Sequence, residues 1–234
     1  LPVFNPNGTY AKYGSFDNHL ALINNLNNDA VGTRVISNVY AQYSLLKNLT
    51  LRTSWSIDFN DLYENNFNNT LILAGQPRGT ATSYLSRDIT LLNEQTLNYR
   101  TTFGENHSLQ AVIGNTLQRN TLQRTSLAGQ QFPSNDLTTI ASAATQTGSS
   151  SSSQAGLVSY FGKVTYSFKD RYTADVSARA DASSRFGTNN KWGYFPAAGL
   201  GWRLGEERFV KDLAIFDELK LRGSLGRTGN QNGI

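Results

Sequence analysis

Hydrophobic and polar residues alternate over long stretches of this chain. Between residues 49 and 60 polar side chains fill the even positions, while the odd positions are largely apolar: Leu49, Leu51, Trp55, Ile57 and Phe59. Residues 172–183 repeat the pattern, with Tyr172, Val176 and Ala178 on one side and charged residues on the other. A period of two residues is typical of a β-strand whose two faces meet different environments. The sequence therefore predicts strands with one apolar and one polar face.

The same test applied to the whole chain predicts an all-β protein of about eight strands. They are expected at residues 34–46, 49–60, 84–103, 107–127, 155–168, 171–184, 193–204 and 218–227. Several are longer than the roughly 5–6 residues usual in soluble proteins. The predicted fold is an antiparallel up-and-down meander that forms part of a large transmembrane β-barrel. Residues 1–33 are expected to be a loop or a poorly ordered lead-in, and residues 34–234 the partial barrel.

The predicted connections alternate between short and long. Tight turns are expected at Lys47-Asn48, 104–106 and Lys169-Asp170, and long polar segments at 61–83, 128–154 and, shorter, 184–192. In an up-and-down meander, alternate connections lie at the same end of the sheet. Outer-membrane barrels show this asymmetry, with short periplasmic turns and long extracellular loops. By parity, residues 206–217 belong to the short-turn end, where the spacing of Phe209, Leu213 and Phe216 suggests one or two turns of helix.

A soluble β-sandwich also alternates in polarity, so the pattern leaves two alternatives open. A barrel in lipid is apolar outside and can be polar inside. Strand length and loop parity favour the barrel, and the candidate lumen-facing residues are then Arg52, Asp58, Asp175, Arg179 and Asp181. A sandwich would instead bury the apolar face, and the protein would be a secreted soluble β-domain that binds carbohydrate or acts as an adhesin.

The long loops are the candidate contacts for a partner or a substrate. They carry Tyr63, Phe67 and Phe132, large side chains that can bury against another molecule. The run of glycine and serine from Gly148 to Ser153 has almost nothing to pack, so we expect it to be the most mobile part of the chain.

The composition argues against metal-binding and catalytic sites. There is no cysteine, and His19 and His107 are the only histidines, so neither a metal site nor a catalytic triad is expected. We predict no cofactor and no enzymatic activity. The net charge of +4 comes from lysines and arginines spread along the chain, so nucleic acid is not an expected partner. No apolar run approaches the roughly 20 residues of a membrane-spanning helix.

The C-terminal part of the chain carries a set of ordered motifs. They are Ser184-Arg185-Phe186-Gly187, Asn190-Lys191-Trp192-Gly193-Tyr194-Phe195-Pro196, Gly201-Trp202-Arg203 and Leu219-Lys220-Leu221-Arg222-Gly223-Ser224. In order and spacing, these motifs closely resemble the barrel of the SusC/RagA family, the TonB-dependent outer-membrane transporters of Bacteroidetes-type bacteria.

The resemblance implies a β-barrel in the bacterial outer membrane, surrounded by membrane lipid. Members of the family import oligosaccharides or peptides, with a SusD-like lipoprotein as a lid at the extracellular mouth. They contact the TonB complex through a plug domain inside the barrel. Residues 1–234 contain nothing that resembles the plug, so we expect the chain to be a segment of the barrel wall.

Overall fold

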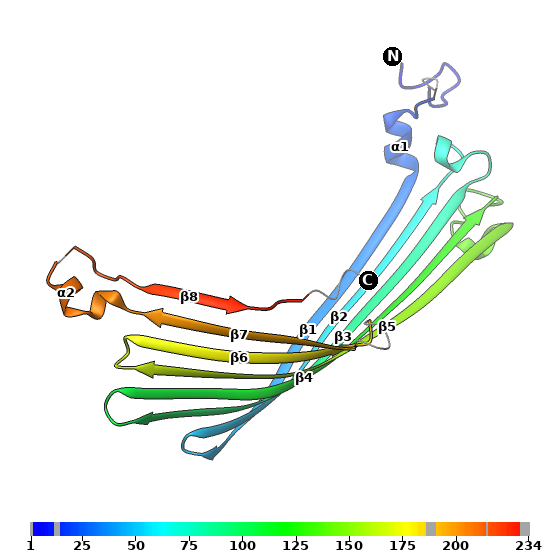
Figure 1. Ribbon diagram of the computed structural model, residues 1–234. Helices are drawn as coiled ribbons and strands as arrows, with labels where there is room; N and C mark the ends of the chain where they lie inside the picture. The colour runs from blue at the N-terminus through cyan, green and yellow to red at the C-terminus, as the bar shows by residue number, and fades with distance from the viewer. Residues whose placement is uncertain (1, 12–14, 186–190, 214, 230–234) are drawn as a thin grey trace. The chain divides into compact units, whose positions relative to one another are not determined.

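The computed structural model describes residues 2–11, 15–185, 191–213 and 215–229. Within them, eight strands form one sheet in which each strand pairs with the next along the chain (Figure 1). The strands are β1 (Leu26–Leu46), β2 (Leu49–Asn68), β3 (Thr80–Phe103), β4 (His107–Gln130), β5 (Thr145–Phe168), β6 (Tyr172–Ser183), β7 (Trp192–Trp202) and β8 (Leu221–Gly226). The predicted all-β meander is confirmed.

Helices are short in the described part of the chain. The α-helices are α1 (His19–Asn25) and α2 (Arg208–Lys211), and the 3₁₀ helices are η1 (Leu73–Gly75), η2 (Ile140–Ser142) and η3 (Leu204–Glu206). None of these helices is long and apolar enough to cross a membrane.

The registers of β5 to β8 show antiparallel pairing between neighbours. Val176 on β6 lies opposite Val164 on β5 and Ala198 on β7, and Ala198 lies opposite Leu225 on β8. Directly opposed residues point to the same face of a sheet. The register therefore fixes which side chains share a face.

The first five strands are longer than predicted, and β1, β2 and β5 by the most. β1 begins at Leu26, inside the segment expected to be a lead-in, and β2 continues to Asn68. The prediction that Gly148 to Ser153 lie in a loop is wrong, because β5 begins at Thr145 and includes them. Residues 145–154 are exposed on both faces of the strand. They contain no large apolar side chain, so the sequence shows no alternation there. The long connections are correspondingly shorter, at residues 69–79 and 131–144.

The chain forms two compact units. Unit 1 comprises Leu1–Val35, Asp58–Ile89 and Thr121–Gln154, and it contains α1 and the long connections. Unit 2 comprises Ile36–Ile57, Thr90–Asn120 and Ala155–Ile234, and it contains the short turns together with β6, β7 and β8.

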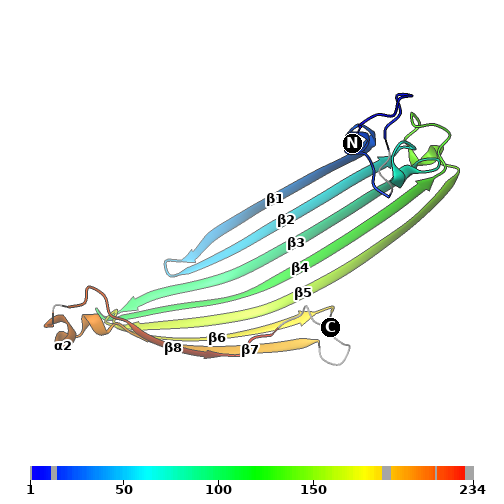
Figure 2. The same cartoon turned by 90° about the horizontal axis from the view of Figure 1, so that it is seen from above.

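The long connections of unit 1 pack against one another (Figure 2). The rings of Phe67 and Phe132 meet edge to face with centroids 5.1 Å apart, and Ala81 and Ala143 complete the buried cluster. The side chain of Asn135 bridges to Thr70, accepting from its backbone N–H at 3.1 Å and donating to its hydroxyl at 3.0 Å. For the two longest of the predicted loops, 61–83 and 128–154, the expected gathering at one end is confirmed. The segment at 184–192 lies mostly outside the described residues.

The N-terminal segment joins the same end of unit 1. The Asp17 carboxylate accepts a hydrogen bond from the backbone N–H of Leu73 at 2.9 Å, and the Asn69 amide donates to the Asn25 side chain at 2.7 Å. These contacts hold α1 beside the connection that contains η1.

The short turns adjoin one another in unit 2. The backbone N–H of Arg100 donates to the carbonyl of Asn48, that of Lys169 to Asn106, and that of Arg203 to Arg171, at 2.9, 2.6 and 2.8 Å. The β7–β8 connection lies at this end too, as parity predicts. Its α-helical part is a single turn, α2, so Leu213 and Phe216 lie beyond the helix.

Candidate functional surfaces

Unit 2 presents one face made of apolar side chains. On β5, β6 and β7 the even positions share this face: Tyr172 stands opposite Phe168 and Trp202. The side chain of Val176 on this face is 62% exposed. Nothing in the described part of the chain covers it.

The first four strands continue this apolar face with their odd positions. On β4, Ile113 lies 3.6 Å from the point where a Cβ of Gly162 would stand, and His107 approaches the hydroxyl of Tyr166 to 2.5 Å. Large apolar residues at these odd positions are exposed: Leu51, Trp55, Leu91, Ile113 and Leu117. We call this surface the apolar face: within unit 2, the odd positions of β1–β4 and β8 and the even positions of β5–β7.

The opposite side of unit 2, the polar face, carries the charged residues. The Arg179 guanidinium donates to the Asp181 carboxylate at 2.6 Å and to the hydroxyl of the buried Ser159 at 2.8 Å. Lys163 lies 3.7 Å from the carboxylate of Asp175. The structure therefore brings three of the predicted lumen residues together with two cross-strand partners, on a face separate from Val176.

Arg52 lines a hollow on the polar face whose volume lies within the range of small-molecule sites. The hollow measures about 680 Å³, and its charged lining residues are all basic: Lys47, Arg52, Arg100 and Lys163. The Arg52 guanidinium stands 4.4 Å from the centroid of the Tyr40 ring, a cation–π contact. Sequence reasoning missed Arg100 and Lys163, because only the register of the strands brings them to Arg52.

Asp58 belongs to unit 1 rather than to this group. Its carboxylate accepts two hydrogen bonds from Arg34, from Nε at 3.0 Å and from Nη2 at 2.8 Å. Both side chains are more than a third exposed, so this bidentate pair adds little stability. The alternation of β2 indicated the face of Asp58 but not its partner on β1.

Of the three residues predicted to lie in long loops, Tyr63 and Phe67 lie on β2, and Phe132 lies in the connection at residues 131–144. Tyr63 is 44% exposed and remains a candidate contact. Phe67 and Phe132 are only 5% and 4% exposed, because they form the core of unit 1. The prediction that these two rings contact a partner is therefore wrong: they pack the long connections together instead.

Glu207 joins three neighbours at the short-turn end. Its carboxylate accepts hydrogen bonds from the Tyr172 hydroxyl at 2.6 Å and the Trp202 indole N–H at 3.1 Å, and Arg171 lies 3.5 Å away. These hydrogen bonds, with the nearby Arg171 charge, lower the pKa of Glu207 below its usual value. The contacts fasten the β7–β8 connection to the ends of β6 and β7.

We expect these contacts to weaken only in acid. A carboxyl whose pKa is lowered by folding stabilises the fold above its unfolded pKa, about 4.3 for glutamate, and loses that contribution as the pH falls through the lower folded value. Fluorescence of Trp202, with Trp55, Trp192 and any tryptophan elsewhere in the full-length protein replaced by phenylalanine, should report a transition below about pH 4. The Glu207→Ala variant should lack it, and the same transition in that variant would contradict the assignment.

No group of three or more His, Asp or Glu side chains that could hold a metal ion occurs in the described ranges. Of the family-like motifs, Phe186, Gly187 and Asn190 lie outside the described residues. Trp192 and Tyr194 begin β7 on the apolar face, where Trp192 stacks on Tyr160 with ring centroids 6.1 Å apart.

Comparison with known proteins identifies similar barrels. The profile of the family described as "TonB dependent receptor-like, beta-barrel" matches residues 2–233. The chain is 30% identical over 237 residues to "TonB-dependent receptor P3" of Formosa agariphila, covering 98% of this chain and 24% of that protein. It is 50% identical over 76 residues to "TonB-dependent receptor SusC" of Bacteroides thetaiotaomicron, covering 32% of this chain and 8% of that protein.

Solved structures show the same fold. The "RagAB peptide transporter" superimposes with a TM-score of 0.86 at 23% identity, covering 98% of this chain and 27% of that chain. The structure of the "RagAB peptide importer in the 'open-open' state" gives a TM-score of 0.87, covering 99% of this chain and 27% of that chain. The chain thus spans about a quarter of the length of the receptor P3 and of the RagAB transporter chain to which it is similar.

Proposed function

Because the chain belongs to the TonB-dependent receptor β-barrel family, we propose that it forms part of the wall of a transporter that imports oligosaccharides or peptides. Proteins of this family are outer-membrane transporters, which gives the location of the chain. The observation that carries the proposal is the division of unit 2 into an exposed apolar face and a charged polar face.

In this proposal the apolar face meets lipid. The hydrocarbon of the bilayer then surrounds the exposed side chains of Val176, Trp55 and Leu91. Contact between apolar side chains and lipid tails is favourable. The polar face lines the lumen, where Arg179 and Asp175 remain in water. A soluble sandwich would need a second layer over the apolar face, and the family assignment argues for the barrel instead.

The long connections of unit 1 lie at the extracellular end in this proposal. They are the docking surface for a SusD-like lipoprotein, and exposed Tyr63, near the adjoining end of β2, is a candidate contact. The TonB complex acts from the opposite end, through a plug that these residues do not include. The family name and the likeness to a RagAB fold support this arrangement.

The cargo in this proposal is polar and is not chemically changed. Arginine, aspartate, serine and threonine side chains on the polar face can hydrogen-bond to peptide groups or to sugar hydroxyls, so the surface suits both classes. The role is one of passage, and the protein is not an enzyme.

Co-purification tests the partner. We expect the Tyr63→Ala variant of the full-length protein, tagged and extracted from its native membrane, to retain about tenfold less lipoprotein than wild type, since a tyrosine contact is often worth more than 1 kcal/mol. Tyr43→Ala is the matched control, because Tyr43 is also exposed but lies on β1 in unit 2. Equal losses in both variants would contradict the docking site.

Uptake tests the transport role itself. A strain that lacks the gene should lose growth on a supplied peptide mixture or on an oligosaccharide, and the wild-type gene should restore it. Unchanged uptake of both cargo classes in the deletion strain would contradict the proposal.

A further inference from the structure

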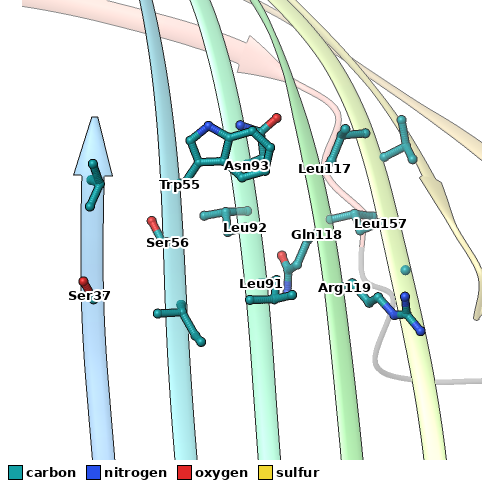
Figure 3. A pocket seen from close by; sticks show the side chains of 14 residues that line it. Ser37, Trp55, Ser56, Leu91, Leu92, Asn93, Leu117, Gln118, Arg119 and Leu157 are labelled. Carbon is teal, nitrogen blue, oxygen red and sulfur yellow. The ribbon is translucent and has the colours of Figure 1, made fainter. Parts of the chain in front are cut away.

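The apolar face of unit 2 is hollowed by a groove that crosses β1 to β5 (Figure 3). Its cavity volume is about 520 Å³, within the range of small-molecule binding sites. Apolar side chains form most of its lining, among them Trp55, Leu91, Leu117 and Val158. These residues occupy apolar-face positions of four different strands, so the groove belongs to the sheet wall itself.

The two ends of the groove differ in chemistry. At one end the Trp55 ring lies beside Asn93, whose buried amide donates to the carbonyl of Ser54 at 3.0 Å (Figure 3). Towards the other end Gly156 has no side chain, and the nearest atom to its missing Cβ is 3.8 Å away. The absence of a side chain at Gly156 helps to keep that end open.

Arg119 is the one charged residue among those that line the groove. Arg119 follows Leu117 along β4, in the direction of the connection at residues 131–144. Figure 3 shows it at the end of the groove away from Trp55. The next positions on the same side of β4 are polar: Thr121, Gln123 and Thr125. The groove therefore leads from an apolar interior to a cationic group where the apolar stretch of β4 ends.

We propose that this groove binds one anionic membrane lipid, with an acyl chain between Leu91 and Leu117 and the headgroup phosphate against Arg119. The inference rests on the proposed function, since it requires the apolar face to lie in the bilayer. The groove is continuous with that face, so a lipid reaches it by lateral diffusion. A guanidinium has five N–H donors and binds phosphate through two of them, so Arg119 can keep its other contacts.

The choice of occupant follows from where the groove opens. A water-soluble cargo in the lumen meets the polar face, where Arg52 and Arg100 lie, and has no route to a groove on the other side of the sheet. A lipid combines a long apolar chain with an anionic end in one molecule. Those two parts match the apolar lining and the single charged residue of the groove.

Filling the groove tests the acyl-chain site. The full-length protein is extracted in mild detergent and the lipid that stays bound is counted by native mass spectrometry. Leu117→Trp, which fills the groove, should lower the bound lipid about tenfold. Ile113→Trp is the matched control, because Ile113 is 61% exposed on the same face of β4 but does not line the groove, and it should leave the lipid in place.

Removing the charge tests the headgroup contact. In phosphatidylcholine nanodiscs that contain a little phosphatidylglycerol, Arg119→Gln should lower retention of phosphatidylglycerol about tenfold, and Arg52→Gln, on the polar face, should not. Equal retention in wild type, Leu117→Trp and Ile113→Trp would overturn the site. Retention unchanged in Arg119→Gln would overturn the preference for an anionic lipid. Cargo uptake is measured separately, so a failure of the lipid site is distinguished from a failure of the transport role.

Discussion

Replacing Val176 by arginine is expected to block assembly of the barrel, whereas Ser177→Arg should be tolerated. Val176 lies on the apolar face between Val164 and Ala198, and an arginine near the bilayer midplane costs about 2 to 4 kcal/mol. Ser177 lies on the polar face opposite Lys163, where a second cation costs roughly 0.2–1 kcal/mol.

The readout of this pair is the fraction of folded protein in the outer membrane, measured by the change in gel mobility on heating. We expect little folded Val176→Arg protein and a near-normal amount of Ser177→Arg. Equal yields would contradict the assignment of the two faces.

Phe132→Ala is expected to loosen the long connections and to leave the membrane part intact. The ring is 4% exposed and packs on Phe67, and removal of a buried phenylalanine side chain costs about 3 to 5 kcal/mol. Amides of residues 69–79 and 131–144 should exchange much faster with deuterium, while those of β6 and β7 should not change.

Leu137→Ala is the matched control for Phe132→Ala. Leu137 lies in the same connection but is 50% exposed, so its truncation leaves no cavity and should not alter exchange. Two outcomes would contradict the view that this cluster organises the loops: faster exchange throughout the chain in Phe132→Ala, or no faster exchange in the loops of that variant.

The alternation of polarity was enough to predict the fold where the two faces differ. β6 is the clearest case, because Val176 and Asp175 point to opposite sides and meet different surroundings. The serine-rich start of β5 was missed for the converse reason: both faces are polar, and backbone pairing of strands needs no apolar side chain. The start of β1, residues 26–33, was missed because apolar and polar residues do not alternate regularly there.

The candidate residues were predicted less completely than the fold. Period two assigned Asp175, Arg179 and Asp181 to one side of β6, and the structure places them together. It could not reveal Ser159 or Lys163 as their partners, because cross-strand contacts depend on register. Nor could it tell exposed Tyr63 from buried Phe67, since burial among loops depends on contacts distant in sequence.

The orientation of the sheet in the membrane is the central claim, and cysteine labelling tests it most directly. Residues 1–234 contain no cysteine, so Leu137→Cys and Asn106→Cys each place one thiol in this segment, in a long connection and in a short turn. Any cysteine elsewhere in the full-length protein is first replaced by serine. Both positions are exposed. In intact cells treated with a membrane-impermeant maleimide, Leu137→Cys should be labelled, and Asn106→Cys should be labelled only after the outer membrane is disrupted. Labelling of Asn106→Cys but not Leu137→Cys in intact cells would reverse the orientation and contradict the proposed docking of a lipoprotein at the long connections.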